Sequence, residues 1–208
     1  MARPTHRTAP GCTYFVTTKT WGGRSLFQVA ETAEIVVEVL LRHRAAGAYH
    51  LHEFVLMPNH LHLLLTPGRT TTLEKAMQLI KGASSYEIHK RRGTRMAVWQ
   101  PSFFESTIRD AQDFRAQADY IRLNPVVAKL AERPDGWPYS SAAGSFALDG
   151  WTPLFSSAAK AADGRLSTSE LKLRPPEDGG MSELKRQAPE YEAMSELKLR
   201  PPKERAGR

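Results

Sequence analysis

The amino-acid sequence predicts an α+β fold of the ferredoxin-like, split βαβ type, with an antiparallel sheet and one additional C-terminal helix. Two observations lead to this prediction. Segments rich in β-branched and aromatic residues alternate with segments in which apolar residues recur at helical spacing. Their order along the chain is β-α-β-β-α-β-α, which is the split βαβ order followed by one extra helix.

The first half of the chain contains three predicted strands and one predicted helix. The stretch "CTYFVTTKT" (12–20) is typical of a strand. Residues 31–46 form the first helix, which Gly47 ends, and its apolar positions are Ala33, Val36, Val37 and Leu40. The segments 49–57 and 60–66 are predicted to form a hairpin, because the Pro58-Asn59 pair between them is a turn signal.

The second half supplies two helices and a strand. Residues 71–93 form the second helix, with Thr71 and Glu74 as a capping box. One face of this helix is predicted to be buried, and it consists of Leu73, Met77, Ile80, Ser84 and Ile88. The stretch 99–109 contains the fourth strand. Asp110 is the expected cap of the third helix, which is predicted to run to Asn124 and to stop at Pro125.

The C-terminal quarter of the chain differs in composition from the rest. Three imperfect copies of one phrase, "SELKLRPPEDGG", "MSELKRQAP" and "MSELKLRPPKERAGR", follow residue 168. They are rich in charge and proline and poor in aromatic residues, so they cannot bury enough surface to offset their ordering entropy. We therefore expect a catalytic domain at residues 1–156 and a disordered, low-complexity tail at 157–208. The repeats are either the product of sequence slippage or a docking motif.

Composition and charge favour a cytoplasmic protein with a polyanionic partner. The chain has one cysteine, Cys12, which excludes an internal disulfide and a thiolate zinc site. Neither a signal peptide nor a membrane span is predicted. The formal net charge is +7 and the pI is about 9.7, and residues 1–164 carry +5 of that charge. A nucleic acid is the partner that such a balance favours.

Two histidines interrupt the apolar segment "MPNHLHLLLTP" (57–67). In a strand, His60 and His62 point to one face with Leu64, while Leu61, Leu63 and Leu65 point to the other face and supply the core. The two imidazoles, about 7 Å apart along the strand, can converge on one metal ion. They can equally lie on a solvated face. A metal site would also need a third ligand from elsewhere in the chain.

The third helix offers candidates for that ligand and for a nucleophile. Tyr120 and Asn124 in "DYIRLNPV" (119–126) are four residues apart and therefore neighbours on one helix face. A different stripe of this helix, with Phe114, Ala118 and Ile121, is predicted to face the core. Asn124 can offer its carbonyl oxygen to a metal, or it can simply cap the end of the helix.

Together, "MPNHLHLLL" and "DYIRLNPV" some sixty residues later resemble the motifs of the single-tyrosine HUH transposases, especially the REP-associated branch. "TYFVTTKT", "FFESTIRD" and "WPYSS" (137–141) add to the resemblance, which runs from about Thr13 to Ser141. It implies metal-dependent cleavage and transfer of single-stranded DNA beside a hairpin, through a 5′-phosphotyrosine. Tyr120 would be the nucleophile, and His60, His62 and Asn124 would hold Mg²⁺ or Mn²⁺. The residues after Asn-Pro depart from the family pattern, in which an arginine is common.

Several basic and aromatic side chains are candidates for DNA contacts. Phosphates could be bound by Lys81, Lys90, Arg91, Arg92, Arg95, Arg115 and Arg122, although these residues could also form ordinary solvated faces. Trp99 and Phe103 could stack on bases, but an aromatic residue in a strand beside a helix is expected in the core. We likewise expect Trp137 and Tyr139 to pack and to fix the chain after the third helix.

Three functional hypotheses remain. The first is a metal-dependent strand transferase that acts on single-stranded hairpin DNA as a monomer or homodimer. The second is a nucleic-acid-binding regulator that kept this fold without catalysis. The third is a zinc-binding module, because two imidazoles and an amide suit zinc or manganese on grounds of ligand softness.

Overall fold

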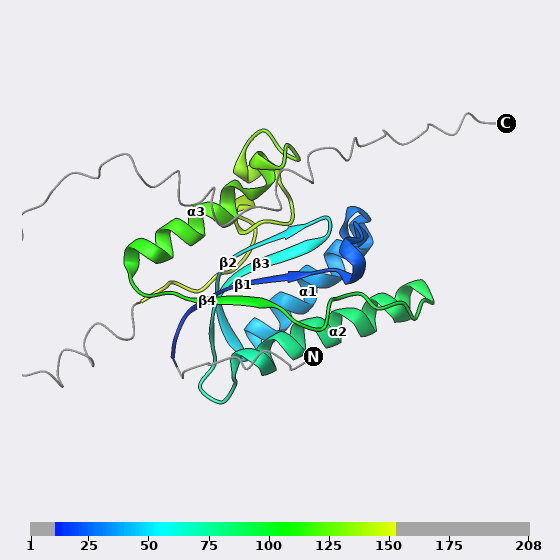
Figure 1. Cartoon of the computed structure of the whole chain (residues 1–208), viewed down its shortest axis with the longest axis horizontal. Coiled ribbons are helices and arrows are strands. Elements are labelled where there is room, and N and C mark those ends of the chain that lie inside the picture. The colour runs from blue at the N-terminus through cyan, green and yellow to red at the C-terminus, as the bar shows by residue number, and fades with distance from the viewer. Residues whose placement is uncertain (1–10, 153–208) are drawn as a thin grey trace, which may run out of the picture. The chain divides into compact units, whose positions relative to one another are not determined.

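The computed structural model describes residues 11–152, and they form a four-stranded antiparallel sheet with helices on both faces (Figure 1). The strands are β1 (Tyr14–Lys19), β2 (Tyr49–Met57), β3 (His60–Pro67) and β4 (Phe104–Thr107). They lie side by side in the order β2-β3-β1-β4. The predicted tail at 157–208 lies outside the described residues.

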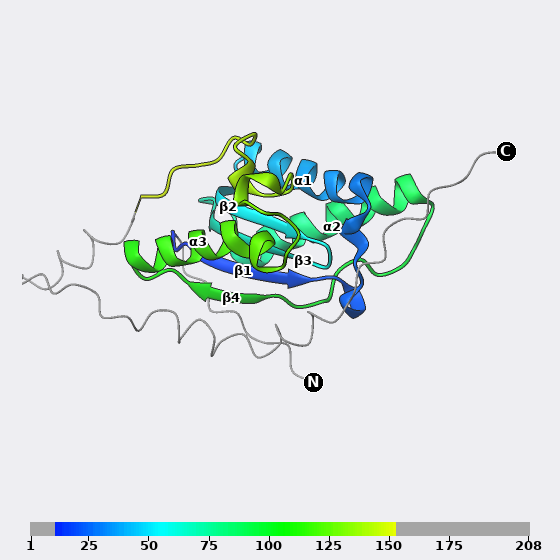
Figure 2. The same cartoon turned by 90° about the horizontal axis from the view of Figure 1, so that it is seen from above.

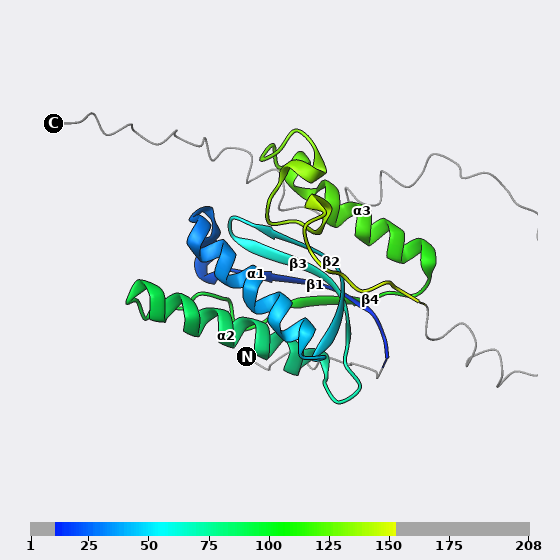
Figure 3. The same cartoon turned by 180° about the vertical axis from the view of Figure 1, so that it is seen from behind.

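Three helices complete the predicted order. α1 (Ala30–Ala45) and α2 (Leu73–Arg92) cover one face of the sheet, as the view from behind shows (Figure 3). α3 (Ala111–Val127) lies on the other face (Figure 2). The observed order β1-α1-β2-β3-α2-β4-α3 confirms the ferredoxin-like arrangement with one additional helix. None of the helices within residues 11–152 is long and apolar enough to cross a membrane.

The core is divided by the sheet into two clusters. Leu61, Leu63 and Leu65 of β3 pack on the side of α1 and α2, as the alternation predicts. Leu64, on the same face as the histidines, packs in a second cluster with Val55 of β2 and residues of α3. α3 therefore covers the part of this face that carries the histidines. His62 is buried, so the alternative of a solvated face is wrong for this residue.

Two predicted helix ends are wrong by one or a few residues. The N-cap of α2 is Thr72, whose hydroxyl accepts a hydrogen bond from the Lys75 N–H at 3.2 Å, so Thr71 is not the cap. Pro125 does not stop α3, which continues to Val127. A proline removes one backbone donor, and here it stands in the last turn, where the bond from Ala128 N–H to Asn124 O resumes the helical pattern at 3.0 Å. Asp110 is the N-cap of α3, as predicted.

The aromatic residues that follow α2 and α3 pack against the rest of the fold. Trp99 is buried, and its indole N–H donates to the Ser84 hydroxyl at 2.9 Å, in agreement with the preferred interpretation of this residue as core. Trp137 donates to the Leu56 carbonyl at 2.9 Å and thereby ties the segment after α3 to β2. Tyr139 belongs to the same segment, where its backbone carbonyl accepts from the Leu56 N–H at 2.8 Å.

Candidate metal and nucleophile site

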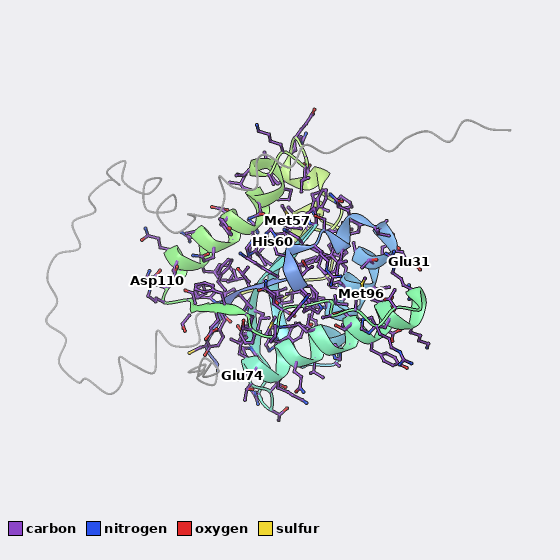
Figure 4. All side chains as sticks on the ribbon, turned by 45° about the vertical axis from the view of Figure 1, so that its right-hand side comes forward. Glu31, Met57, His60, Glu74, Met96 and Asp110 are labelled. Carbon is purple, nitrogen blue, oxygen red and sulfur yellow. The ribbon has the colours of Figure 1, made fainter. Side chains whose placement is uncertain are left out.

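The two histidines lie at the start of β3, on the face of the sheet that α3 covers. Their ring centroids are 4.7 Å apart. His60 pairs with Met57 across the β2–β3 hairpin, and Figure 4 shows these two labelled residues together on the side of α3, away from Glu74 on α2. The alternation of β3 therefore brings the two imidazoles together, as the sequence predicts.

Each imidazole is held at its Nδ1 atom by a neighbouring polar side chain. His60 Nδ1 lies 2.7 Å from the amide oxygen of Asn59, and His62 Nδ1 lies 2.8 Å from the hydroxyl of Thr17. An amide oxygen only accepts hydrogen bonds, so Nδ1 of His60 carries the proton. Its Nε2 atom then keeps a lone pair that can bind a cation.

The Nε2 atom of His62 is buried and has no hydrogen-bond partner among the described residues. A buried polar atom in this state calls for an explanation such as a missing ion. The Thr17 hydroxyl is able to accept from Nδ1–H of His62. In that tautomer His62 matches His60, and the two Nε2 atoms form a pair of neutral ligands. This arrangement fits a divalent cation.

Burial keeps both imidazoles neutral. It lowers the pKa of His60 to about 4, with a further contribution from the positive charge of Lys19. The pKa of His62 is also lowered well below its usual value by burial, by His60 and by Lys19. Since only a neutral imidazole binds a metal, the site is ready to take one without first losing a proton at neutral pH.

α3 brings Tyr120 to His62, and Asn124 contacts Tyr120 from the same helix. The ring of Tyr120 lies 5.3 Å from that of His62 and 5.8 Å from that of Phe15, with edge-to-face geometry in both cases. Tyr120 is half-buried against the second core cluster. Burial raises the pKa of its hydroxyl, and a hydrogen bond with the Asn124 side chain lowers that pKa to a smaller extent.

Asn124 is buried, with 1% of its surface exposed. It lies on the buried side of α3 and contacts Tyr120, so it does not merely cap an exposed helix end. Among the described residues no group of three or more His, Cys, Asp or Glu side chains could hold a metal. His60 and His62 would therefore need a third ligand of another type, and Asn124, which contacts Tyr120, is the predicted candidate.

Arg122 on α3 ion-pairs with Glu53 on β2, whose side chain is nearly buried. The second carboxylate oxygen of Glu53 accepts from the Ser141 hydroxyl at 2.5 Å. Ser141 also accepts from the Phe54 N–H at 3.1 Å. These contacts connect α3, β2 and the "WPYSS" segment, and they fix the helix that carries Tyr120 over the sheet.

The other basic candidates lie apart from the histidines. The Lys81 ammonium donates to the carbonyls of Gln100, Pro101 and Ser102 at 2.5, 3.1 and 3.1 Å, and burial lowers its pKa to about 8. Arg91 pairs with Glu38 at 3.4 Å. The candidates Lys90, Arg91, Arg92 and Arg95 are grouped at the end of α2, and Arg115 is exposed on α3.

Three residues that contact or face the histidines were not identified from the sequence, because their residue types alone do not indicate this role. Asn59 and Thr17 hold the histidines, and Lys19 faces His60 across the β1–β3 pair. Asn59 is adjacent to His60, so its contact could have been anticipated. Thr17 and Lys19 are found only once the register of β1 against β3 is known.

Known proteins similar in sequence to this chain are transposases. Residues 12–124 match the family model described as "Transposase IS200 like", and the chain belongs to this family. It is 24% identical to the REP-associated tyrosine transposase of Escherichia coli K12 over 132 residues, which are 63% of this chain and 76% of that protein.

A solved structure has the same fold. It is a REP-associated tyrosine transposase bound to a REP hairpin, and it matches with a TM-score of 0.58 and 22% identity. The match covers 81% of this chain and all of that one. The ferredoxin-like fold predicted from the sequence is thus also the fold of a REP-associated transposase.

Proposed function

We propose that this protein cleaves and rejoins single-stranded DNA next to a hairpin, with Tyr120 as the nucleophile. One observation carries the proposal: α3 holds the ring of Tyr120 against that of His62 on β3, although the two motifs are about sixty residues apart in the chain. The family membership supports a role in DNA transposition.

The proposed reaction exchanges one phosphoester for another. The Tyr120 oxygen attacks the scissile phosphorus, the bond from phosphorus to O3′ breaks, and a 5′-phosphotyrosine and a free 3′-hydroxyl result. In the net reaction the phenol proton ends on the departing 3′-oxygen. Because one phosphoester replaces another, a 3′-hydroxyl can later attack the phosphotyrosine and join the strands.

His60, His62 and Asn124 are the residues that would hold a divalent ion such as Mg²⁺ or Mn²⁺. The ion would neutralise charge on the scissile phosphate, which phosphoryl transfer requires. Asn59 holds the imidazole of His60 in the tautomer that presents Nε2, and Thr17 hydrogen-bonds Nδ1 of His62, which leaves its Nε2 atom for the ion. The contact of Asn124 with Tyr120 acts against the effect of burial, because it lowers the pKa of the hydroxyl that must lose its proton.

The proposed substrate is single-stranded DNA with a hairpin. This follows from the relative that was solved with a REP hairpin. The exposed basic residues at the end of α2 and on α3 are proposed to bind the phosphates of the hairpin, and they include Lys90, Arg91, Arg92 and Arg115. For Lys81 and Arg122 we propose that any DNA contact is secondary to the internal contacts described above.

The proposal is tested with end-labelled hairpin oligonucleotides that carry single-stranded flanks, incubated with Mn²⁺ or Mg²⁺. We expect a covalent protein–DNA adduct that survives denaturing electrophoresis. Tyr120→Phe should form no adduct and should still bind the hairpin, because the ring that packs on Phe15 and His62 is retained. An adduct formed undiminished by this variant would refute the assignment of the nucleophile.

The same experiment separates the other two hypotheses. A regulator without catalysis would bind the hairpin and form no adduct with either metal. A zinc-binding module would retain stoichiometric zinc through purification and show no cleavage. His62→Ala is the companion variant, and it should abolish the adduct while Tyr120 remains intact.

A further inference from the structure

The half of the sheet face formed by β1 and β4 is left partly open. α3 packs mainly on β2 and β3, and seen from above β1 and β4 run beside α3 (Figure 2). Residues paired across an antiparallel ladder point to the same face. By this register five side chains of these two strands face the site, and we call them the β1–β4 strip. They are Phe15, Thr17, Lys19, Phe104 and Ser106. They are apolar, hydroxyl-bearing or cationic.

Phe104 is the exposed aromatic residue of this strip. It lies on β4 opposite Thr17, and Thr17 lies opposite His62 on its other side. Phe104 and His62 are therefore two strand spacings apart, about 10 Å. The side chain of Phe104 is 61% exposed, so it adds little to the core. An exposed aromatic ring beside a phosphoryl-transfer site provides a surface on which a base can stack.

Lys19 supplies a cation on the same strip. It is exposed and lies opposite His60 at the end of β1. Because Lys19 and His60 are paired across the antiparallel ladder, their side chains project from the same face of the sheet. The strip thus presents one flat apolar ring and one positive charge next to the histidine pair.

We propose that Phe104 and Lys19 bind the single-stranded segment of DNA adjacent to the scissile phosphate, with one base stacked on the Phe104 ring and one backbone phosphate bound by Lys19. This inference rests on the proposed function, which supplies the single strand. A single strand offers an accessible base face together with a phosphate in each nucleotide, whereas a duplex hides its base faces between neighbouring pairs.

Binding is measured by fluorescence anisotropy with short, unstructured oligonucleotides in the presence of a chelator, so that no cleavage occurs. Phe104→Ala should raise the dissociation constant between about fivefold and a hundredfold, and Phe104→Trp should restore it. Tyr86→Ala is the matched control, because Tyr86 is 63% exposed on α2 and lies away from this strip. This control should bind as the unmodified protein does.

A scan with single abasic sites tests the stacking directly. For the unmodified protein, removal of one particular base should weaken binding, and the same removal should have no effect on Phe104→Ala. Lys19→Gln should reduce the slope of log K against log salt by about 0.7, the value for one phosphate on a single strand. Circular dichroism of each variant establishes that it is folded.

The results also distinguish this inference from the proposed function. Unchanged affinity in Phe104→Ala and in Lys19→Gln would overturn the inference even if Tyr120 forms the covalent adduct. Weaker binding by Phe104→Ala, together with one abasic site that weakens binding only in the unmodified protein, would support the inference even if no adduct forms. In that case only the cleavage proposal would be refuted. A weakening in Phe104→Ala that no abasic site reproduces would overturn the stacking role.

Discussion

Arg122 of α3 forms an ion pair with Glu53 of β2, and this pair joins the helix that carries Tyr120 to the sheet that carries the histidines. The Glu53 side chain is 7% exposed, whereas that of Arg122 is 48% exposed. Removal of Arg122 would therefore cost free energy of folding, because the Glu53 carboxylate would stay buried without its cation. The sequence predicted Arg122 as a phosphate ligand, and the structure gives it an internal partner.

Arg122→Ala should destabilise the protein. Loss of the cation leaves Glu53 with the Ser141 hydroxyl but without a counter-charge, and we expect a decrease of about 1–3 kcal/mol in the free energy of unfolding. Urea denaturation measures this quantity. Arg115→Ala, an exposed position on the same helix, is the control and should change it by less than about 0.5 kcal/mol. Weaker DNA binding at unchanged stability would instead identify Arg122 as a DNA contact.

Lys81 leads to a similar prediction on α2. Its ammonium donates to three backbone carbonyls in the segment before β4, so Lys81→Met should remove all three hydrogen bonds. We expect a loss of roughly 1–3 kcal/mol in stability and little change in the salt dependence of DNA binding. Lys90→Met, exposed on the same helix, should show the opposite behaviour. A lower salt slope for Lys81→Met at full stability would show that this lysine binds phosphate.

Local periodicity explains how much of the fold could be predicted. The alternation in β3 assigns Leu61, Leu63 and Leu65 to the core and His60 to the other face, because side chains in a strand alternate whatever surrounds them. Pro125 was misleading, since the general cost of a proline in a helix says little about a position in the last turn. Tertiary packing allows the helix to continue there.

The site could be predicted only in part, because half of it depends on register. The pairs His60 with His62 and Tyr120 with Asn124 follow from strand and helix geometry within one element. Their meeting, and the role of Thr17, depend on how β1, β3 and α3 assemble. The partner of Arg122 has the same origin, since a sequence shows that a residue is charged but not which buried carboxylate it will meet.

Thr17→Val should weaken metal binding. Valine has nearly the shape of threonine but has no hydroxyl to hydrogen-bond Nδ1 of His62, so the imidazole would lose the contact that holds its ring in place. We expect the affinity for Mn²⁺ to fall by about tenfold or more, measured by titration of the free-ion EPR signal. Thr18→Val is the matched control, because Thr18 is buried and points to the opposite face.

The outcome for this pair of variants is decisive in both directions. Equal Mn²⁺ affinity in Thr17→Val and the unmodified protein would show that His62 does not need Thr17 to bind the metal. The expected difference should disappear in a His62→Ala background, since Thr17 acts on the metal only through that imidazole.

His52 should make the stability of the fold depend on pH. Its Nδ1 atom lies 3.0 Å from the Asp149 carbonyl and its Nε2 atom 2.9 Å from the Thr66 hydroxyl. A carbonyl only accepts, so Nδ1 carries the proton and Nε2 accepts from Thr66. Burial lowers the pKa of His52 despite opposing contributions from Asp149 and Glu53, and His50 lowers it further.

The sign of the effect follows from the lowered pKa. Below about pH 6.5 the unfolded chain binds a proton at His52 that the folded chain does not, so stability is lost as the pH falls through this range. A single such group contributes at most about 1.4 kcal/mol per pH unit. Between pH 7.5 and 5.5, urea denaturation should therefore show a decrease that is about 1 kcal/mol smaller in His52→Gln than in the unmodified protein.

The control for this prediction is His50→Gln, the neighbouring histidine with an exposed side chain. It should retain most of the pH dependence of the unmodified protein, because burial, and not the charge of His50, is the largest cause of the lowered pKa of His52. Burial also lowers the pKa of His43, His60 and His62, so part of the dependence should remain in His52→Gln and become smaller when these residues are also replaced. An identical pH dependence in His52→Gln and the unmodified protein would show that His52 gains its proton equally easily in the folded and unfolded states.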